Sequence, residues 1–367
     1  MIRVLQVLPA LNFCGGIESY LMNYYRRLDK SEVQFDFITH TDLECSYHDE
    51  IAGMGGQIFE LPIFSAANLP KLLKQLNIFF EHNSGKYAAL HVHMANAAPF
   101  YFHYAGKYGL KNLILHSHQP RGADILSHRI RNYPLLKAAN HMATDRVACT
   151  ELAGRFLFGS KPFRIIRNAI DTQKFSFSAS KREKIRQQLD MQDNLIVGCV
   201  GRFTAQKNQR FSLEVFEALH KIRPEARLLF IGDGPDKPQI EALVQEKGLR
   251  EVVKFLGTCK EVSDYYQAFD IFLMPSLYEG LGIVMVEAQC TGLPVFASRE
   301  NIPVDVKMTD KFQFVSLSES PEAWAERIAR VETENRCDMS AAIAAHHYDI
   351  EQETAVLQDF YQNLKIY

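Results

Sequence analysis

One periodicity constrains the fold of this chain more than any other feature. Short apolar, β-branched runs alternate with longer helical stretches, and the alternation starts a second time near the middle of the chain. Such runs are typical of strands in a parallel sheet, because helices cover both faces of that sheet. The pattern therefore predicts an α/β protein with two Rossmann-like, doubly wound parallel sheets, and 367 residues are enough for two domains.

The expected strands form two sets, separated by a polar connecting helix at Lys181–Leu189. Helices are expected between most strands, for example at Gly16–Leu28 and Pro70–His82. The first set is Ile2–Leu8, Gln34–Thr39, Gly56–Leu61, Ala88–Met94, Asn112–His118, Arg146–Thr150 and Phe163–Arg167. The second set is Leu195–Val200, Ala226–Ile231, Val252–Leu256, Ile271–Met274, Pro294–Ala297 and Phe312–Leu317.

A small, polar stretch at Asn168–Ser180 is predicted to link the two domains. We therefore expect an N-terminal domain of residues 1–171 and a C-terminal domain of residues 172–349. The tail, Ile350–Tyr367, is predicted to be a helix that crosses back to the first domain. Ligands of open parallel sheets bind outside the carboxyl ends of the strands, so the expected site is a cleft that both domains face.

Composition narrows the classes of function. The 41 basic and 43 acidic residues give a formal net charge of −2, which excludes a globally basic nucleic-acid binder. No apolar run of about 18 residues occurs, so we expect no transmembrane helix, and the N-terminal residues lack the pattern of a secretion signal. Seven scattered cysteines without a C-x-x-C pair predict reduced, buried thiols in a cytoplasmic protein.

Two glutamates bracket a glycine-rich helix start in the second half of the chain. Gly280 and Gly282 let the backbone approach a ligand closely, and the free N–H groups of the helix start attract phosphate. Glu279 before the helix and Glu287 in its second turn can each accept hydrogen bonds from hydroxyl groups. This spacing favours a nucleotide-sugar, which has phosphates in the middle and polyols at both ends. The alternative is a solvated pair of glutamates.

Cations and a second glycine turn follow two other strands. Arg202 and Lys207 come after Leu195–Val200, where they can meet a diphosphate; an ordinary charged surface loop is the alternative. Gly15 and Gly16 follow the first strand and also permit close approach to a phosphate, although such turns are common. No G-x-G-x-x-G occurs in these turns, which does not favour a nicotinamide cofactor.

Two His-x-His pairs end neighbouring strands of the first half: His91 with His93, and His116 with His118. Residues two apart in a strand share a face. Metal ligation is one interpretation, but no carboxylate or cysteine cluster accompanies the pairs and no Asp-x-Asp occurs, so we predict no metal site. We expect His93 and His118 to reach into the cleft, with His91 and His116 packed more deeply.

Taken together, these residues resemble glycosyltransferase family 4, the retaining nucleotide-sugar transferases with the GT-B fold. The resemblance covers the whole chain, and its opening residues look like the bacterial capsular and extracellular polysaccharide branch. It is carried by the Gly15-Gly16 turn, Ile166–Asp171, Gly201–Phe203 with Lys207, Leu229–Pro235 and Asp270–Pro294. Leu281 and Ala169 stand where the family often has Phe and Gly.

The resemblance implies a role for each matching residue. His118, Glu279, Arg202 and Lys207 would be catalytic: His118 beside the reacting sugar, Glu279 on its hydroxyls, and the two cations on the diphosphate. Glu287 would bind the ribose. The other donor-binding positions would be Gly15, Gly16, Thr258, Gly280, Leu281, Gly282 and Ile283. His93 and Arg121 would lie on the acceptor side.

The resemblance also implies the reaction. A hexose or N-acetylhexosamine would move from a nucleotide-sugar, a UDP-sugar before a GDP-sugar, by front-face attack without a protein nucleophile or a metal cofactor. The acceptor would be an undecaprenyl-diphosphate-linked or other oligosaccharide, and no nucleic-acid partner is expected. Two alternatives are a nucleotide-sugar epimerase with the GT-B fold and a non-catalytic binding or scaffold relative.

One segment of the first half is locally basic. Residues 103–137 contain six Lys or Arg and one acidic residue, with apolar residues interleaved. One interpretation is a surface that meets an anionic membrane, with the protein peripheral on the inner face of the cytoplasmic membrane. The other is a solvated helix face whose charge is balanced by acidic neighbours.

Overall fold

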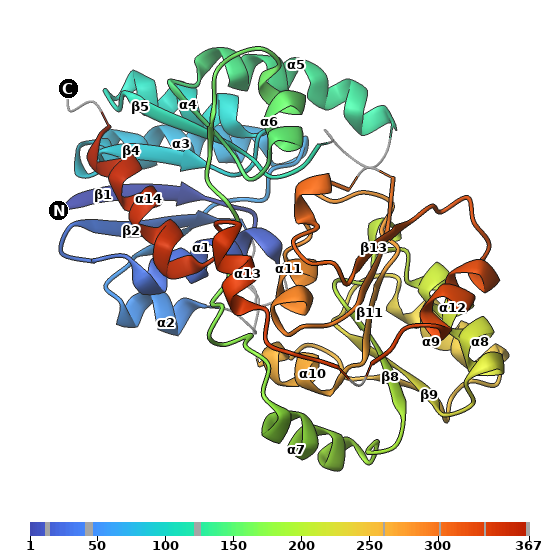
Figure 1. Cartoon of the computed structure of the whole chain (residues 1–367). Coiled ribbons are helices and arrows are strands. Elements are labelled where there is room, and N and C mark those ends of the chain that lie inside the picture. Colours follow the sequence, from blue (N-terminus) through green and yellow to red (C-terminus); the bar gives the residue numbers. More distant parts are fainter. Residues whose placement is uncertain are drawn as a thin grey trace. The chain divides into compact units, whose positions relative to one another are not determined.

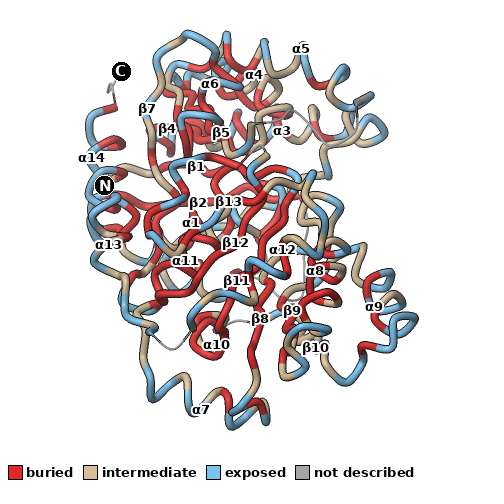
Figure 2. The backbone as a smooth tube through the Cα atoms, turned by 45° about the vertical axis from the view of Figure 1, so that its right-hand side comes forward, coloured by how far each residue is buried: buried red, intermediate tan, exposed pale blue. Residues whose placement is uncertain are grey.

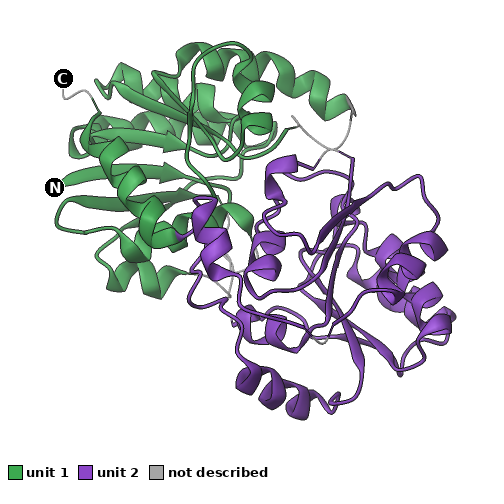
Figure 3. Ribbon diagram, in the orientation of Figure 1, with its two compact units in different colours: residues 1–169, 350–367 green, residues 170–349 purple. Residues whose placement is uncertain are grey.

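Every strand pair in both sheets is parallel, as the alternating sequence pattern predicts. The computed structural model describes residues 1–11, 15–40, 47–120, 126–259, 261–300, 302–333 and 335–364, apart from the side chain at position 126. The chain forms two compact units (Figure 3), unit 1 from residues 1–169 and 350–367 and unit 2 from residues 170–349. The first dividing point lies two residues before the expected 171/172 boundary.

Unit 1 contains a seven-stranded sheet in the order β3-β2-β1-β4-β5-β6-β7. Its strands are β1 Ile2–Val7, β2 Val33–Thr39, β3 Ile58–Glu60, β4 Ala89–Val92, β5 Asn112–Ser117, β6 Asp145–Ala148 and β7 Arg164–Ile165. The strand order reverses between β1 and β4, which is the switch point of a doubly wound sheet. The central strands are almost wholly buried, as Figure 2 shows in red.

Unit 2 repeats this plan with six strands in the order β10-β9-β8-β11-β12-β13. They are β8 Leu195–Val200, β9 Ala226–Ile231, β10 Val253–Phe255, β11 Ile271–Met274, β12 Val295–Ser298 and β13 Phe312–Val315. Here the switch point lies between β8 and β11. Each sheet separates two apolar clusters, one on each face, so the helices of each unit form its outer layers.

The described helices alternate with these strands. In unit 1 they are α1 Gly16–Arg27, α2 His48–Gly53, α3 Leu69–Asn83, α4 Ala98–Lys107, α5 Leu126–Met142, α6 Glu151–Phe158 and α14 Ile350–Gln362. In unit 2 they are α7 Ala179–Leu189, α8 Gln209–Ile222, α9 Lys237–Glu246, α10 Val262–Ala268, α11 Ile283–Cys290, α12 Pro321–Ala329 and α13 Ser340–Ala345. Through these residues, no helix combines the length and apolar character needed to cross a bilayer.

The tail helix α14 belongs to unit 1, as predicted, and ends at Gln362. Figure 1 shows it in red beside the blue α1, and Leu357, Phe360 and Tyr361 share a buried apolar cluster with Tyr24 of α1. Arg27 of α1 also pairs with Glu351 at 2.5 Å. The last segment of the chain therefore completes the layer that covers the first strands.

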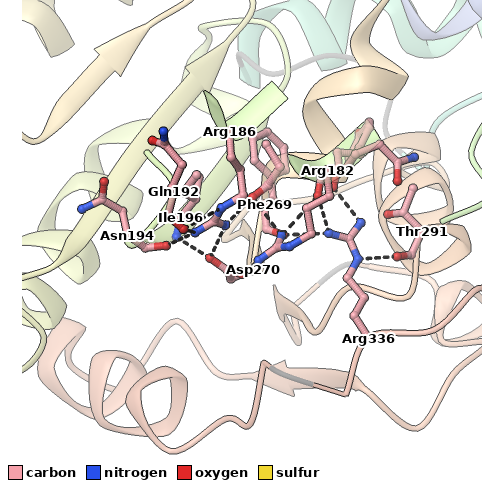
Figure 4. A network of polar contacts seen from close by, with 12 residues as sticks. Arg182, Arg186, Gln192, Asn194, Ile196, Phe269, Asp270, Thr291 and Arg336 are labelled. Carbon is pink, nitrogen blue, oxygen red and sulfur yellow. Dashed lines mark hydrogen bonds and ion pairs between the residues drawn. The ribbon is translucent and has the colours of Figure 1, made fainter. Parts of the chain in front are cut away.

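The polar helix α7 is not a free connector between the units, because its arginines are anchored in unit 2. Arg182 and Arg186 both pair with Asp270, which is buried just before β11 (Figure 4). Asp270 also accepts a hydrogen bond from the backbone N–H of Ile196 at 2.7 Å. Arg186 is buried and Arg182 half-buried in these contacts, whereas the other polar side chains of α7 are exposed, so these two arginines provide the polar anchoring of the helix.

Three arginines cap the C-terminal end of α10. Arg336 donates to the carbonyl oxygens of Tyr266, Gln267 and Phe269, as Figure 4 shows in part. Arg182 and Arg186 donate to further carbonyls of the same turn. Cations are favoured there because the carbonyls at a helix end are unpaired and carry the negative end of the helix dipole.

The cysteines are free thiols wherever they are described, but they are not all buried. Cys149, Cys199 and Cys290 are buried, Cys259 is half-buried and Cys337 is exposed. The expectation of buried thiols is therefore wrong for the last two. Cys14 and Cys45 lie outside the described residues.

We expect Asp270→Asn to lower the free energy of unfolding of unit 2 by about 3 kcal/mol. Removing the charge of one partner in a buried ion pair leaves the opposite charge uncompensated. Here two arginines lose their counterion, and the effect is moderated because one of them is partly exposed. Urea unfolding followed by tryptophan fluorescence measures the loss, because Trp324 lies in the core of unit 2. Asp233→Asn is the control; its carboxylate is 63% exposed, so a change above about 0.5 kcal/mol is not expected. Equal losses in the two variants would contradict this assignment.

Candidate functional site

The switch point of unit 2 joins two of the loops that the sequence singles out. β8 and β11 are neighbours, and the loops that leave their carboxyl ends are hydrogen-bonded to each other. Leu277 N donates to Gln206 O at 2.8 Å, Gln206 Nε2 donates to Tyr278 O at 3.0 Å, and Asn208 Nδ2 donates to Pro275 O at 3.1 Å. The two loops are therefore joined by hydrogen bonds at the place where ligands of doubly wound sheets bind.

Lys207 and Glu279 form an ion pair across these loops. Lys207 Nζ lies 2.7 Å from Glu279 Oε1, and the side chains are 18% and 5% exposed. Gln206 Nε2 approaches the second carboxylate oxygen at 3.5 Å. The sequence analysis treats this cation and this carboxylate separately, and the ion pair brings them to one position. Each can still form further hydrogen bonds with a ligand.

The glycines of the 229–235 motif allow three loops to pack backbone against backbone. Gly232 has φ of 131°, and a Cβ there would lie 2.1 Å from the carbonyl oxygen of Gly201. Phe203 N donates to Asp233 O at 2.9 Å, and Gly232 N donates to Gly257 O at 2.8 Å. This motif therefore shapes the loops after β8, β9 and β10 and contributes glycines for packing.

Helix α11 starts from Gly282, whose φ of 79° is the left-handed conformation that glycine adopts at least cost. The N–H groups of Ile283 and Val284 open the helix and have no acceptor in a preceding turn, whereas Met285 N already donates to Gly282 O at 2.8 Å. Gly280 and Leu281 are buried, and the Leu281 side chain packs in the core of unit 2. Only the backbone of Leu281 can therefore contact a ligand.

Glu287 is a buried carboxyl in the second turn of α11, as predicted. Its Oε2 accepts a hydrogen bond from the Tyr266 hydroxyl at 2.9 Å. Burial raises the pKa of Glu287 to about 7, although this hydrogen bond and the charge of Lys174 act in the opposite direction. Sequence reasoning missed Tyr266, because nothing in a helix 21 residues away marks it as a partner.

Arg202 and Thr258 lie in the same set of loops, and both are exposed. The described part of the chain gives the Arg202 guanidinium neither a hydrogen bond nor an ion pair. It therefore remains available to an anionic group. Its position after β8 is the one that the sequence predicts.

In unit 1, the Gly15-Gly16 turn forms the start of α1 and carries an unforeseen carboxylate. Gly15 is the N-cap residue. A Cβ at Gly15 would lie 1.8 Å from Glu18 Oε2, so the buried Glu18 side chain folds back over this glycine. A glutamate three residues after the N-cap is one half of the capping-box pattern, and this local signal could have found it. A carboxylate here favours hydroxyl groups of a ligand over phosphate.

The four histidines share one face of the unit 1 sheet, as their spacing predicts. The rings of His91 and His93 stack with centroids 4.5 Å apart, and those of His116 and His118 stack at 3.9 Å. His91 and His116 are deeply buried, as expected. His93 is also buried, and both of its ring nitrogens are hydrogen-bonded, to Gln6 and to His118. His93 therefore has no nitrogen left for an acceptor.

Burial determines the charge of these rings. Because a charged imidazole would lose its hydration, burial lowers the pKa of His91 and of His118 to about 3 and lowers the pKa of His93 and His116 strongly. Ring nitrogens of His91, His93 and His116 lie within 4.8 Å of one another, an arrangement in which a metal ion could be held. His91 Nε2 is hydrogen-bonded to His116 Nδ1, and His93 Nδ1 is hydrogen-bonded to His118 Nε2. The other acceptor-side candidate, Arg121, lies outside the described residues.

Comparisons with known proteins give one consistent family. The family model "Glycosyl transferases group 1" matches residues 181–347. A putative glycosyltransferase, EpsF of Bacillus subtilis, is 34% identical over 376 residues, covering 98% of this chain and 96% of its own. The capsular polysaccharide biosynthesis glycosyltransferase CapH of Staphylococcus aureus is 24% identical and covers 99% of both chains.

Solved structures agree on the fold. The structure of HepE from Anabaena in complex with UDP and glucose superposes with a TM-score of 0.80 and covers 99% of this chain and all of its own. The sequence identity is 17%, so this likeness concerns the fold.

We expect Glu287→Gln to stabilise the protein at pH 8 by up to about 3 kcal/mol. An ordinary glutamate ionises near pH 4.5, whereas native Glu287 holds its proton to about pH 7. The unfolded state therefore releases this proton first, and native stability falls as pH rises from about 4.5 to 7. A neutral glutamine avoids that loss.

Urea unfolding at pH 8 and at pH 5 measures this effect. At pH 5 most of the difference is absent, and the gain should shrink below about 1 kcal/mol. Glu241→Gln, at a position 47% exposed, is the matched control and should change little at either pH. A gain that is the same at both pH values would show that Glu287 titrates normally.

Proposed function

The chain belongs to glycosyltransferase family 4, and on this premise we propose that it transfers a hexose or N-acetylhexosamine from a UDP-sugar to a lipid-linked or glycan acceptor. It has the GT-B fold of that family, with two Rossmann-like domains. The observation that carries the proposal is the Lys207–Glu279 ion pair at the switch point of unit 2. Similarity to CapH, which is named for capsular polysaccharide biosynthesis, supports a role in bacterial surface polysaccharide synthesis.

In this proposal, unit 2 binds the donor in an extended arrangement. Glu287 accepts hydrogen bonds from the ribose hydroxyls, and Glu279 accepts them from the sugar. The N–H groups at the start of α11 and the exposed Arg202 contact the diphosphate between them. UDP in the HepE complexes supports a uridine donor.

Cations supply the main electrostatic assistance. As the bond to the sugar breaks, negative charge develops on the diphosphate, and Arg202, Lys207 and the α11 start stabilise it. The acceptor hydroxyl approaches from the side on which the diphosphate leaves and passes its proton to the departing phosphate oxygen, so the anomeric configuration is retained without a protein nucleophile. Because these groups already provide positive charge, we propose a reaction that needs no metal cofactor.

We expect Lys207→Ala to reduce the rate of UDP release about 10²- to 10³-fold, because one preorganised charge is lost from the leaving group. The assay supplies UDP-glucose, UDP-N-acetylglucosamine or the GDP-sugars together with lipid-linked oligosaccharide, and it records nucleoside diphosphate and the anomer formed. A thermal-shift series with the same nucleotides reports binding, since a ligand of the native state raises its stability.

The matched control is Lys221→Ala, which removes a lysine 73% exposed at the end of α8 and should retain activity. Transfer that survives both Lys207→Ala and Glu279→Ala would refute the site. Sugar interconversion without nucleoside diphosphate release would instead identify an epimerase, and nucleotide binding without turnover would identify a non-catalytic relative.

The acceptor side concerns unit 1, where we propose contact with an anionic membrane. Ile130 and Tyr133 on α5 are 69% and 61% exposed, which is unusual for large apolar side chains. Arg131 and Lys137 are exposed on the same helix, and Lys137 lies over the Tyr133 ring at 5.4 Å. Apolar side chains flanked by basic ones suit an anionic bilayer surface, where a lipid-linked acceptor would be found.

We expect the double substitution Ile130→Glu and Tyr133→Glu to abolish co-sedimentation with vesicles that contain anionic phospholipid. Each change removes apolar area that the bilayer would bury on binding, and each adds a negative charge that the anionic lipids repel. Ile78→Glu on α3, at another exposed isoleucine of unit 1, is the control and should still sediment. Binding of the unaltered protein that does not depend on anionic lipid would refute membrane contact through this segment.

A further inference from the structure

A network of hydrogen-bonded polar side chains crosses the face of the unit 1 sheet that α1 and α14 cover. Its members are Gln6 on β1, His91 and His93 at the end of β4, His116 and His118 at the end of β5, and Tyr361 on α14. All except His118 are buried. The family resemblance places His118 beside the reacting sugar, but the proposed mechanism gives no role to the hydrogen bonds that link these six side chains, so the network requires its own explanation.

The first branch starts at the amide oxygen of Gln6. His93 Nε2 lies 2.9 Å from this oxygen, and because a carbonyl oxygen only accepts, that nitrogen carries the proton. A neutral imidazole has one N–H, so His93 Nδ1 must accept. His118 Nε2 lies 2.7 Å from His93 Nδ1 and is therefore the donor. The second nitrogen of His118, Nδ1, is left as a bare acceptor.

The second branch starts at the amide nitrogen of Gln6, which donates to the Tyr361 hydroxyl oxygen at 3.1 Å. That hydroxyl in turn donates a hydrogen bond to His91 Nδ1, 2.7 Å away. His91 then carries its proton on Nε2 and donates to His116 Nδ1 at 3.1 Å. The orientation of one amide thus determines the proton position on all four rings, which is Nε2 in each.

This reasoning requires neutral rings, and burial provides them. The pKa of each of the four imidazoles is lowered far below neutrality by the loss of hydration, so each ring carries a single proton under ordinary conditions. Tyr361 keeps its proton too, because burial raises its pKa. Every hydrogen bond in the two branches therefore has an assigned direction once Gln6 is oriented. The branches end at two buried nitrogens without a partner among the described residues, the His116 Nε2–H and the bare His118 Nδ1.

We propose that Gln6 is a positioning residue that acts through His93 to fix the tautomer of His118, so that His118 Nδ1 accepts a hydrogen bond from a hydroxyl of the donor sugar. The inference rests on the proposed function and on the role beside the reacting sugar that the family resemblance implies for His118. His118 Nδ1 is a buried atom without a hydrogen-bond partner among the described residues. A buried acceptor in that state indicates a ligand group that donates to it.

The chosen tautomer suits the proposed chemistry. A bare ring nitrogen accepts a hydrogen bond from a sugar hydroxyl, whereas the other tautomer would present an N–H and reverse the direction of that hydrogen bond. A neutral acceptor also avoids placing a second positive charge beside an oxocarbenium-like sugar. The fixed amide therefore determines both the direction of the hydrogen bond and the charge next to the reacting carbon.

The tautomers can be measured on the unaltered protein. Long-range ¹H–¹⁵N correlation spectra of ¹⁵N-histidine-labelled protein distinguish a protonated from a bare ring nitrogen. We expect His91, His93, His116 and His118 all to carry the proton on Nε2 at neutral pH. Protons on Nδ1 in all four would mean that the amide of Gln6 is reversed, and would overturn the proposal.

Two variants separate a positioning role from a structural one. Gln6→Met removes both amide contacts at similar volume, so His93 and His118 should lose their single tautomer and show averaged ¹⁵N shifts. Tyr361→Phe removes only the second branch, so the shifts of His91 and His116 should change while those of His93 and His118 stay. Unchanged shifts of His118 in Gln6→Met would overturn the proposal without reference to activity.

Kinetics provide the functional test. Gln6→Met should raise the KM for the UDP-sugar about fivefold to tenfold, which corresponds to one neutral hydrogen bond, and Tyr361→Phe should change it less than twofold. Equal effects of the two variants would indicate a structural role. If the enzyme uses no UDP-sugar but the tautomers are as expected, the proposed function fails and the assignment of Gln6 stands.

Addition of one equivalent of Zn²⁺ distinguishes the remaining possibility. The hydrogen-bonded network should bind no metal at this level, and the histidine resonances should stay in place. Loss of the ring N–H signals of His91, His93 and His116 on addition of Zn²⁺ would identify these residues as a metal site and overturn the proposal.

Discussion

A parallel sheet that is covered by helices on both faces accommodates polar side chains mainly where its strands end. In unit 1, the face under α1 and α14 is apolar at Val4, Ala89 and Ile114. Further along the same strands it becomes polar at Gln6, His91 and His116. Because all strands run in one direction, these polar positions converge at one edge of the sheet, and the chemistry of the chain is concentrated there.

Strand β11 illustrates how the two ends of one strand serve different purposes. Asp270 precedes it, is buried, and is neutralised by arginines of α7. Glu279 follows it and is paired with a lysine that is less deeply buried. The oxygens of Asp270 are occupied by hydrogen bonds from protein groups, and this carboxylate stabilises the unit. The oxygens of Glu279 can still accept hydrogen bonds from a ligand. Burial raises the pKa of Glu287, so its ionised form destabilises the protein. Such a cost in stability is common at functional sites.

The central elements could be predicted from the sequence almost residue by residue. β8, β9 and β11 have the predicted bounds because their apolar, β-branched runs are short and end at turn residues. The edge strands β3 and β7 are shorter than predicted, since few neighbours pair with them and hydrophobicity alone does not mark where pairing stops. The polar helix α7 was predicted, but its anchoring was not, because the pattern of polar residues cannot reveal an ion pair with the buried Asp270, 84 residues away.

The candidate site divides in the same way. The sequence by itself determined the residue types at the strand ends, namely the glycines, glutamates, cations and histidines, because local spacing and turn chemistry specify them. Only the tertiary structure decided which of these groups meet: Lys207 with Glu279, Tyr266 with Glu287, and Gln6 with Tyr361, which is 355 residues away. Proton positions and pKa values depend on such contacts and on burial, and both exist only once distant segments have packed together.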